Sequence, residues 1–134
     1  PPTGPPATAG QRIEGMNEIV FLQRPPRLSR DEWLAIWQGS HTDIAIETQS
    51  TFGYRQNVVV RPLSEGGPVI DAIIEENFPE RAIGSRMAFY DAENNPELYR
   101  QREQIMIESC ARFIDFDKLD CIPTSEYVLK RLSD

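Results

Sequence analysis

Apolar residues recur along the chain with two periodicities, one typical of β-strands and one typical of helices. Strand-forming residues dominate four stretches: Asn17 to Gln23, Thr51 to Arg61, Val69 to Phe78 and Leu119 to Leu129. A spacing of three or four positions predicts two long helices, over Ser29 to Thr48 and Pro96 to Ile114. A proline in the first turn also favours a short helix over Pro79 to Asp91.

The order of the long elements is strand, helix, strand, strand, helix, strand. This order predicts an α+β, ferredoxin-like βαββαβ fold with a four-stranded antiparallel sheet. Both long helices would cover one face of the sheet and leave the other face bare. We expect that bare face to carry one of two alternating sets, Phe52, Tyr54, Val58 and Val60 or Ile70, Ile74 and Phe78. Such an apolar patch indicates a homodimer, in which two sheets pair, or a tandem copy of the domain.

The ends of the chain differ in composition from the predicted domain. Residues 1–16 begin PPTGPPATAG, which has too many prolines and glycines for a helix or strand and is typical of an arm or linker. Residues 17–130 are predicted to form the domain, and residues 131–134 a tail. The chain begins with Pro1 rather than Met, so we interpret it as trimmed or as part of a longer polypeptide.

Charge and cysteine content narrow the class of protein. A net charge of −7 argues against nucleic acids and anionic membranes as partners, because no basic surface is available to meet phosphates. No apolar run approaches the length of a membrane span, and no secretory signal precedes the domain. Cys110 and Cys121 lack metal-type spacing and are interpreted as reduced thiols of a cytoplasmic protein, with a disulfide as the less favoured reading.

The helix predicted over Ser29 to Thr48 carries the only histidine of the chain. Trp33, Trp37 and His41 follow at intervals of four and are predicted to share its inward face. Gly39 weakens the helix beside them and leaves room there for a ligand or for close packing. An imidazole can take up or return a proton near neutral pH, so His41 is a candidate general acid/base. The alternative is a core histidine that is only hydrogen-bonded.

Four stretches of the chain resemble the EthD-domain family, which belongs to the dimeric α+β barrel superfamily. They read LSRDEWLAIWQGSH, TFGYRQNVVV, VIDAIIEENF and ARFIDFDKLDCIPTSEYV. The resemblance covers nearly all of residues 17–130. The chain departs from the family at Ala72, where glycine is usual, and over residues 79–95, which are longer than typical. The resemblance implies a fold in which two sheets close into a barrel.

The same resemblance implies candidate site residues. The family's aromatic residue one helical turn before a histidine corresponds to Trp37 before His41. The other matching positions are Tyr54, Asn57, Asp71, Phe78, Phe113 and Glu126. We take His41, Tyr54 and Asn57 as candidate catalytic residues, and the candidate substrate-binding residues are Trp37, Asp71, Phe78 and Phe113. Because Tyr54 and Asn57 lie an odd number of positions apart on one strand, only one of them shares a face with His41.

Relatives in this superfamily include polyketide cyclases and dehydratases, lactone isomerases, cofactor-independent monooxygenases and haem enzymes, so the fold does not decide the reaction. We expect a small-molecule enzyme, with no cofactor and no metal, that acts on an apolar aromatic or polyketide-like substrate. His41 would transfer protons, while Tyr54 or Asn57 would stabilise a developing oxyanion. Two alternatives stay open: a ligand-binding accessory module, and a relative in which His41 ligates haem iron.

Overall fold

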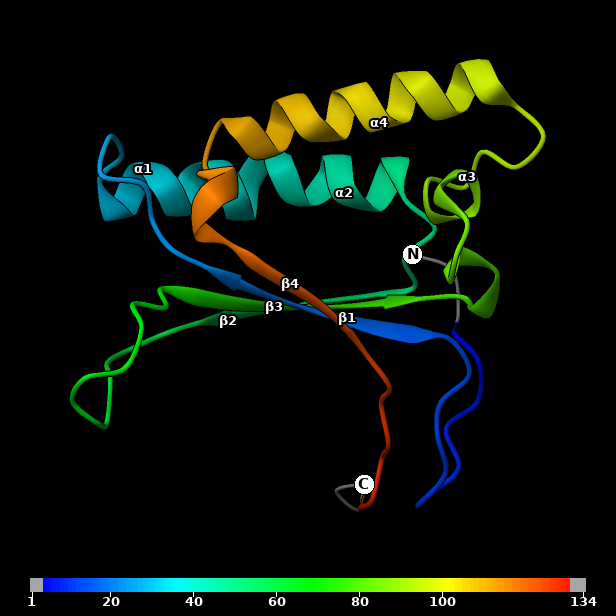
Figure 1. Cartoon of the computed structure of the whole chain (residues 1–134), viewed down its shortest axis with the longest axis horizontal. Coiled ribbons are helices and arrows are strands. Elements are labelled where there is room, and N and C mark those ends of the chain that lie inside the picture. Colours follow the sequence, from blue (N-terminus) through cyan, green and yellow to red (C-terminus); the bar gives the residue numbers. More distant parts are fainter. Residues whose placement is uncertain (1–3, 131–134) are drawn as a thin grey trace.

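The computed structural model describes residues 4–130 and shows an antiparallel sheet with helices on one side (Figure 1). The strands are β1 (Met16–Leu22), β2 (Gly53–Val58), β3 (Ala72–Phe78) and β4 (Asp120–Thr124). They lie in the order β2-β3-β1-β4, and every neighbouring pair is antiparallel. The predicted α+β, ferredoxin-like βαββαβ fold is confirmed.

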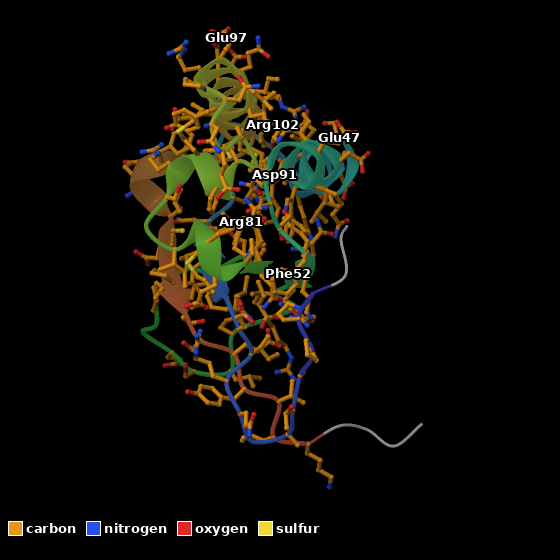
Figure 2. All side chains as sticks on the ribbon, turned by 90° about the vertical axis from the view of Figure 1, so that its right-hand side faces the viewer. Glu47, Phe52, Arg81, Asp91, Glu97 and Arg102 are labelled. Carbon is orange, nitrogen blue, oxygen red and sulfur yellow. The ribbon has the colours of Figure 1, made fainter. Side chains whose placement is uncertain are left out.

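Two long helices cover one face of the sheet (Figure 1). They are built from α1 (Arg30–Leu34), the π-helical segment η1 (Ala35–His41), α2 (Thr42–Thr48) and α4 (Pro96–Ala111). The first three run on as one helix, which begins at a capping box between Ser29 and Glu32. The second long helix is capped by Asn95. Figure 2 shows Glu47 and Glu97 on the outer side of this helix layer, where charged side chains stay in water.

The segment between β3 and α4 differs from its prediction. The single helix predicted over Pro79 to Asp91 is wrong, because the chain forms a 3₁₀ turn, η2 (Glu80–Ala82), and a short helix, α3 (Arg86–Phe89). Gly84 separates the two with a φ of 80°, a left-handed conformation that does not continue a helix. A second 3₁₀ turn, η3 (Phe116–Lys118), leads into β4.

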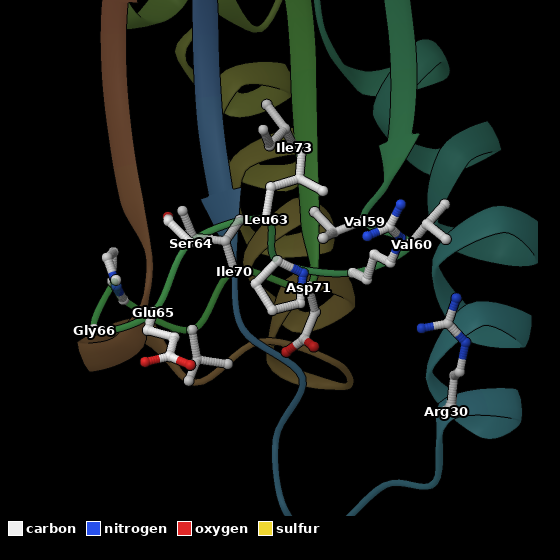
Figure 3. Close-up of a pocket in the computed structure, with 15 residues that line it drawn as sticks. Arg30, Val59, Val60, Leu63, Ser64, Glu65, Gly66, Ile70, Asp71 and Ile73 are labelled. Carbon is white, nitrogen blue, oxygen red and sulfur yellow. The ribbon is translucent and has the colours of Figure 1, made fainter.

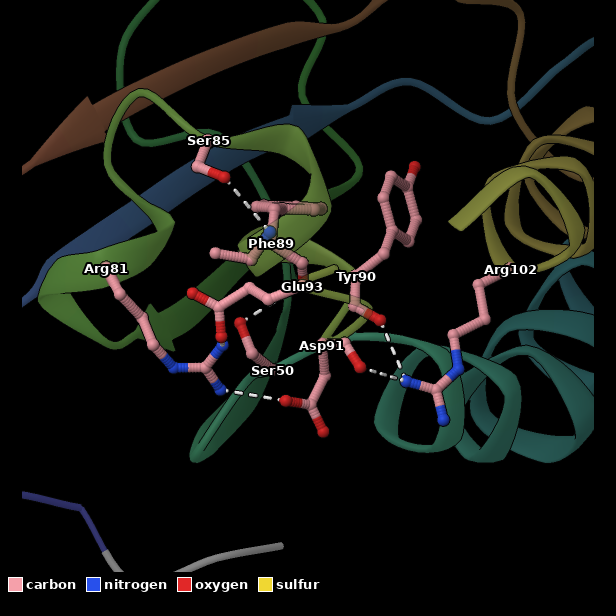
Figure 4. A network of polar contacts seen from close by, with 9 residues as sticks. Ser50, Arg81, Ser85, Phe89, Tyr90, Asp91, Glu93 and Arg102 are labelled. Carbon is pink, nitrogen blue, oxygen red and sulfur yellow. Dashed lines mark hydrogen bonds and ion pairs between the residues drawn. The ribbon is translucent and has the colours of Figure 1, made fainter. Parts of the chain in front are cut away.

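Polar contacts hold this segment in place beside α4 (Figure 4). The Arg81 guanidinium contacts the carboxylates of Asp91 at 2.8 Å and Glu93 at 2.6 Å. From α4, Arg102 donates to the backbone oxygens of Tyr90 at 2.9 Å and of Asp91 at 2.8 Å. The ion pairs of Arg81 are exposed and contribute little stability each, so the Arg102 bonds to the backbone are the more constraining contacts.

The helix side of the sheet holds the core. Val20 and Ile74 are buried there against Trp33 and Trp37. Ile74 lies opposite Val20 on one side and opposite Gln56 on the other, and residues paired in this way point to the same face. Tyr54 and Val58 from one predicted set, and Ile74 and Phe78 from the other, therefore point to the helices and not to the bare face.

The other side of the sheet carries no helix, and we call it the open face. Its residues are Gly53, the apolar Ile19, Phe21, Ile73 and Ile122, and the polar Asn17, Arg55, Asn57, Glu75, Asn77, Asp120 and Thr124. Polar residues are thus more frequent on this face than the two predicted sets implied. Asn17 and Asn77 are nevertheless buried, because the Glu126 carboxylate covers them and accepts from both amides.

Two parts of the chain project on the side of the open face (Figure 1). One is a ribbon, formed where Gly10 and Ile13 donate backbone N–H groups to the carbonyls of Val128 and Glu126. The other is the loop of residues 59–71 between β2 and β3. Together the ribbon and the loop flank the open face at its two ends.

The strand predicted over Leu119 to Leu129 is wrong in its second half. β4 ends at Thr124, and the chain then turns away from β1 and pairs with the arm through an Arg12–Tyr127 bridge. Pro123 lacks the N–H group that a longer ladder needs. Part of the arm predicted for residues 1–16 is thereby attached to the domain, whereas residues 1–3 and the tail 131–134 lie outside the described residues. Within residues 4–130, no helix combines the length and apolarity that crossing a membrane requires.

Candidate functional site

The helix that carries His41 is wider than an α-helix over η1. At its end the backbone N–H of Thr42 donates to the carbonyl oxygen of Trp37, five residues earlier, and the Thr42 hydroxyl donates to the same oxygen at 2.7 Å. Gly39, a weak helix former, lies inside this wide turn. π-Helical turns inside α-helices occur frequently at functional sites. The turn places both Trp37 and His41 in the interior.

His41 lies between the two long helices and is only 2% exposed. Its Nδ1 atom is 2.8 Å from Oγ of Ser109 on α4, and its ring packs on Phe113 with centroids 4.5 Å apart. Arg112 donates to Ser109 Oγ at 2.7 Å and to Ser40 Oγ at 2.8 Å. Burial, together with the positive charge of Arg112, lowers the pKa of His41 to about 4. His41 is therefore a neutral imidazole at pH 7, and one of its two ring nitrogens is bonded to Ser109.

This packing bears on the haem alternative. A haem iron ligand needs a ring nitrogen open to the metal, and the ring of His41 is enclosed by Ser109 and Phe113. The residues around His41 do not fit a haem group. Also, no three or more His, Cys, Asp or Glu residues in the described part of the chain are arranged to hold a metal ion.

Trp37 connects the helix to the sheet through Tyr54. The Trp37 indole N–H donates to the Tyr54 hydroxyl at 3.0 Å, and the Gln56 amide donates to the Thr42 hydroxyl at 2.8 Å. Because Thr42 also bonds the Trp37 carbonyl, these four side chains tie the wide helical turn to β2. Burial raises the pKa of Tyr54 above its usual range, so the phenol keeps its proton. The phenol is thereby held in a fixed position as a neutral hydrogen-bonding group.

Tyr54 belongs to a polar row that crosses the helix side of the sheet. It lies opposite Glu76 on β3, and Glu76 lies opposite Glu18 on β1. Glu76 is 5% exposed, and within residues 4–130 its Oε1 atom has no hydrogen-bond partner. Burial and the nearby Glu18 raise the pKa of Glu76 to about 8. The core thus contains a carboxyl group that is protonated at neutral pH and partly unpaired.

Glu18 and Glu76 were not among the residues predicted for the site. The signal was in the strand pattern, since Glu76 alternates with Ile74 and Phe78, which point to the core. A glutamate in an apolar alternating set is either at the end of the buried stretch or buried itself. Only the pairing of β3 between β1 and β2 shows that it is buried.

Asn57 and Asp71 do not lie with His41 and Tyr54. Asn57 is on the open face, where its amide donates to the Glu75 carboxylate at 3.0 Å. Of the two candidates on β2, only Tyr54 points to the side of His41, in line with the odd separation. Asp71 precedes β3 and its carboxylate accepts the backbone N–H of Arg24 at 2.7 Å, so it does not orient the imidazole.

Phe78 and Phe113 are both fully buried. Phe78 stacks on Phe89 with ring centroids 4.2 Å apart, at the end of the sheet covered by α3. Phe113 packs on His41, and its carbonyl oxygen accepts the indole N–H of Trp33 at 3.0 Å. The structure therefore brings Trp37, His41 and Phe113 into one core, whereas Phe78 belongs to a separate aromatic contact.

The two thiols lie near the carboxyl row. Both are free, and burial raises the pKa of each to about 12, with the charge of Glu76 acting on Cys110 and that of Glu18 on Cys121. Neither thiol is therefore ionised at neutral pH, which makes both weak nucleophiles.

Two hollows are found near the end of the sheet where β2 is joined to β3. One, of about 750 Å³, is lined by the loop of residues 59–71 together with Arg30 of α1 and Ile73 of the open face (Figure 3). A second, of about 420 Å³, adjoins Phe21 and Asp120. Asp71 lines the first cavity, and it is the one predicted site residue that lines either of the two.

The comparisons with known proteins concern the fold. No protein-family model matches the sequence, and no curated protein matches it. An EthD (ethyl tert-butyl ether D) family protein from Bacillus halodurans is similar in structure, with a TM-score of 0.58 and 9% identity over 84% of this chain and 98% of that chain. A dimeric ferredoxin-like protein of unknown function from Thermobifida fusca aligns over 90% of this chain and 95% of that chain, with a TM-score of 0.48 and 9% identity. The predicted structural resemblance to the EthD family is confirmed at the level of the fold.

Proposed function

We propose that this protein binds a small apolar molecule with a carbonyl oxygen between the helices and the sheet and promotes proton transfer on it. The observation that carries the proposal is the polar row of Tyr54, Glu76 and Glu18 inside an otherwise apolar layer. Polar groups are costly to bury, and a neutral carboxyl beside a fixed phenol is an arrangement suited to proton transfer.

The neighbours of the row indicate the kind of ligand. Trp37 and Ile74 pack beside Tyr54, and Cys110 covers it from α4. Such a lining favours a planar, mainly apolar molecule with one or two oxygens, the class to which aromatic and polyketide-like compounds belong. Tyr54 would donate to the carbonyl oxygen while that oxygen gains negative charge.

His41 enters this proposal as a positioning residue. Its bond to Ser109 and its packing on Phe113 fix α4 against the first helix, and that contact holds Trp37 over Tyr54. The acid/base role expected for His41 stays a prediction. A substitution of His41 tests both roles.

Tyrosine-to-phenylalanine substitution tests the binding site. Trp33 and Trp37 are the only tryptophans, so their fluorescence reports binding of an aromatic ketone such as 2-tetralone. We expect Tyr54→Phe to weaken the affinity by about 3- to 10-fold, the value of one hydrogen bond. Tyr127→Phe, on the exposed ribbon, is the matched control and should leave the affinity unchanged.

The outcomes separate the candidate functions. If 2-tetralone does not quench the fluorescence, or if both phenylalanine variants bind it equally, the proposed site is wrong. If Tyr54→Phe weakens binding and the wild-type protein brings about no proton exchange on the ketone, a ligand-binding accessory module is the better description.

The open face supports the proposal that two copies pair. Ile122 on this face is 45% exposed, and the flanking ribbon and loop expose Leu129, Tyr127, Leu63 and Val60 still more. A sheet face with apolar centres and two projecting arms has the shape of a surface that receives a second copy. We infer a homodimer, or a pair of tandem copies, with the sheets facing each other.

Light scattering tests this pairing with two closely matched variants. Ile122 on the open face and Ile105 on α4 are 45% and 46% exposed, so Ile122→Asp and Ile105→Asp place the same charge on equally exposed sites. We expect the wild type and Ile105→Asp to be dimers and Ile122→Asp to be a monomer. A monomeric wild type, or an Ile122→Asp variant that remains a dimer, would contradict pairing through this face.

A further inference from the structure

The carboxyl groups of Glu18 and Glu76 form a pair across neighbouring strands. The two residues are direct partners in the β1–β3 ladder and point to the helix side. Side chains at such positions have Cβ atoms about 5 Å apart. Two carboxylates this close in a buried place repel each other, so one of them keeps its proton over a wider pH range.

Packing alone does not account for this pair. Glu76 is almost fully buried, yet its Oε1 atom lacks a partner among the residues described. An unpaired buried oxygen costs stability, whereas an apolar residue at this position would pack without that cost. The atom is thus available for a hydrogen bond to a molecule that enters the core.

The pair lies closest to solvent on the side of β4. The helix side of β4 is uncovered, because Cys121 and Pro123, which lie opposite Val20 and Glu18, are both exposed. Glu18 is half-buried, and Glu76 beyond it is buried. Exposure therefore decreases step by step across the sheet, from β4 towards β3.

We propose that Glu18 and Glu76 are the acid–base pair of this protein and that their reaction is proton exchange at the carbon beside a ketone or related carbonyl group. The inference rests on the proposed function and names the groups that carry it out. The charged carboxylate of the pair takes the proton from the carbon, whose C–H electrons form a carbon–carbon double bond. The neutral carboxyl passes its proton to the carbonyl oxygen, which receives the carbonyl π electrons. One proton is gained and one lost, so the pair keeps its charge.

The electrostatics of the pair agree with this role. Burial raises the pKa of Glu18 as well as that of Glu76, and a hydrogen bond with Cys121 partly opposes the shift at Glu18. The other titratable groups that face the pair are Tyr54, Cys110 and Cys121, and all three are neutral at pH 7.

Deuterium exchange tests the pair. The full chain is incubated with 2-tetralone in D₂O at neutral pD, and loss of the α-hydrogen signals is followed by proton NMR. We expect the wild type to accelerate exchange above buffer and Glu76→Gln to reduce that acceleration by about 100-fold, a typical contribution of one acid–base group. Glu75→Gln, on the same strand but on the open face, is the control and should exchange at the wild-type rate.

A second measurement makes the result independent of the ligand. Carbon-13 NMR of the glutamate carboxyl groups should show one group titrating near pH 8 in the wild type, and Glu18 should return towards its ordinary pKa in Glu76→Gln. The inference is overturned if both carboxyls titrate below pH 5, or if Glu76→Gln retains the wild-type exchange rate. A ketone that fails to bind overturns the proposed function, while the titration still decides whether the two carboxyls share a proton.

Discussion

Two buried titratable side chains of this protein, His41 and Glu76, have opposite surroundings. His41 is 2% exposed and Glu76 is 5% exposed, and burial keeps each in its neutral form. His41 is bonded to Ser109 and packed on Phe113, whereas Glu76 keeps an unpaired oxygen. This difference between a bonded imidazole nitrogen and a carboxyl oxygen without a partner among the described residues is the reason why we propose Glu76, rather than His41, as the acid–base group.

Their locations explain the difference. His41 projects from one helix towards another, where Ser109 and Phe113 contact its ring. Glu76 projects from β3 below the helices, and β1 with Glu18 separates it from the exposed edge strand β4.

The largest expected effect comes from removing the ring that encloses the histidine. Phe113 is fully buried, so Phe113→Ala should lower the free energy of unfolding by about 4 kcal/mol. Urea unfolding followed by circular dichroism measures the loss. Ile105→Ala, on the exposed side of α4, should cost less than about 1 kcal/mol. A similar small loss for Phe113→Ala would mean that the ring lines a ligand site rather than the scaffold.

Lowering the pH should destabilise the protein through protonation of His41 in the unfolded chain. The folded pKa of His41 is about 4 and the unfolded value about 6.5, so the unfolded chain binds a proton first as the pH falls. Stability is fully present above pH 6.5 and is lost towards pH 4. Relative to His41→Gln, the wild type should lose about 3 kcal/mol between pH 7 and pH 4. Parallel pH profiles for the two proteins would show that the imidazole is already charged or solvated.

Raising the pH should destabilise the protein through ionisation of Glu76. The folded pKa of Glu76 is about 8 and its ordinary value 4.5, so its stabilising contribution is full below pH 4.5 and is lost as the pH rises through 8. Relative to Glu76→Gln, the wild type should lose about 2 kcal/mol between pH 6 and pH 8. The two unfolding profiles are compared in urea. A wild type that keeps its full stability at pH 8 has a Glu76 with an ordinary pKa.

Local patterns predicted the elements well and their ends less well. The capping box at Ser29 and the four-residue spacing of Trp33 and Trp37 depend on neighbours along the helix, and both predictions are confirmed. The helix predicted over Pro79 to Asp91 depends on Gly84, whose left-handed conformation interrupts it. Alternation also separated Tyr54 from Asn57, because two residues an odd distance apart on a strand face opposite sides.

Local patterns in the chain were enough to predict most strands and helices, their order, and the inward direction of Trp37 and His41. Those features follow from the spacing of residues within each element. The contact of His41 with Ser109 and the neighbouring positions of Glu18 and Glu76 are visible only in the folded protein. Each of these contacts joins residues far apart in the chain, so it depends on strand register and helix packing, which no local pattern records.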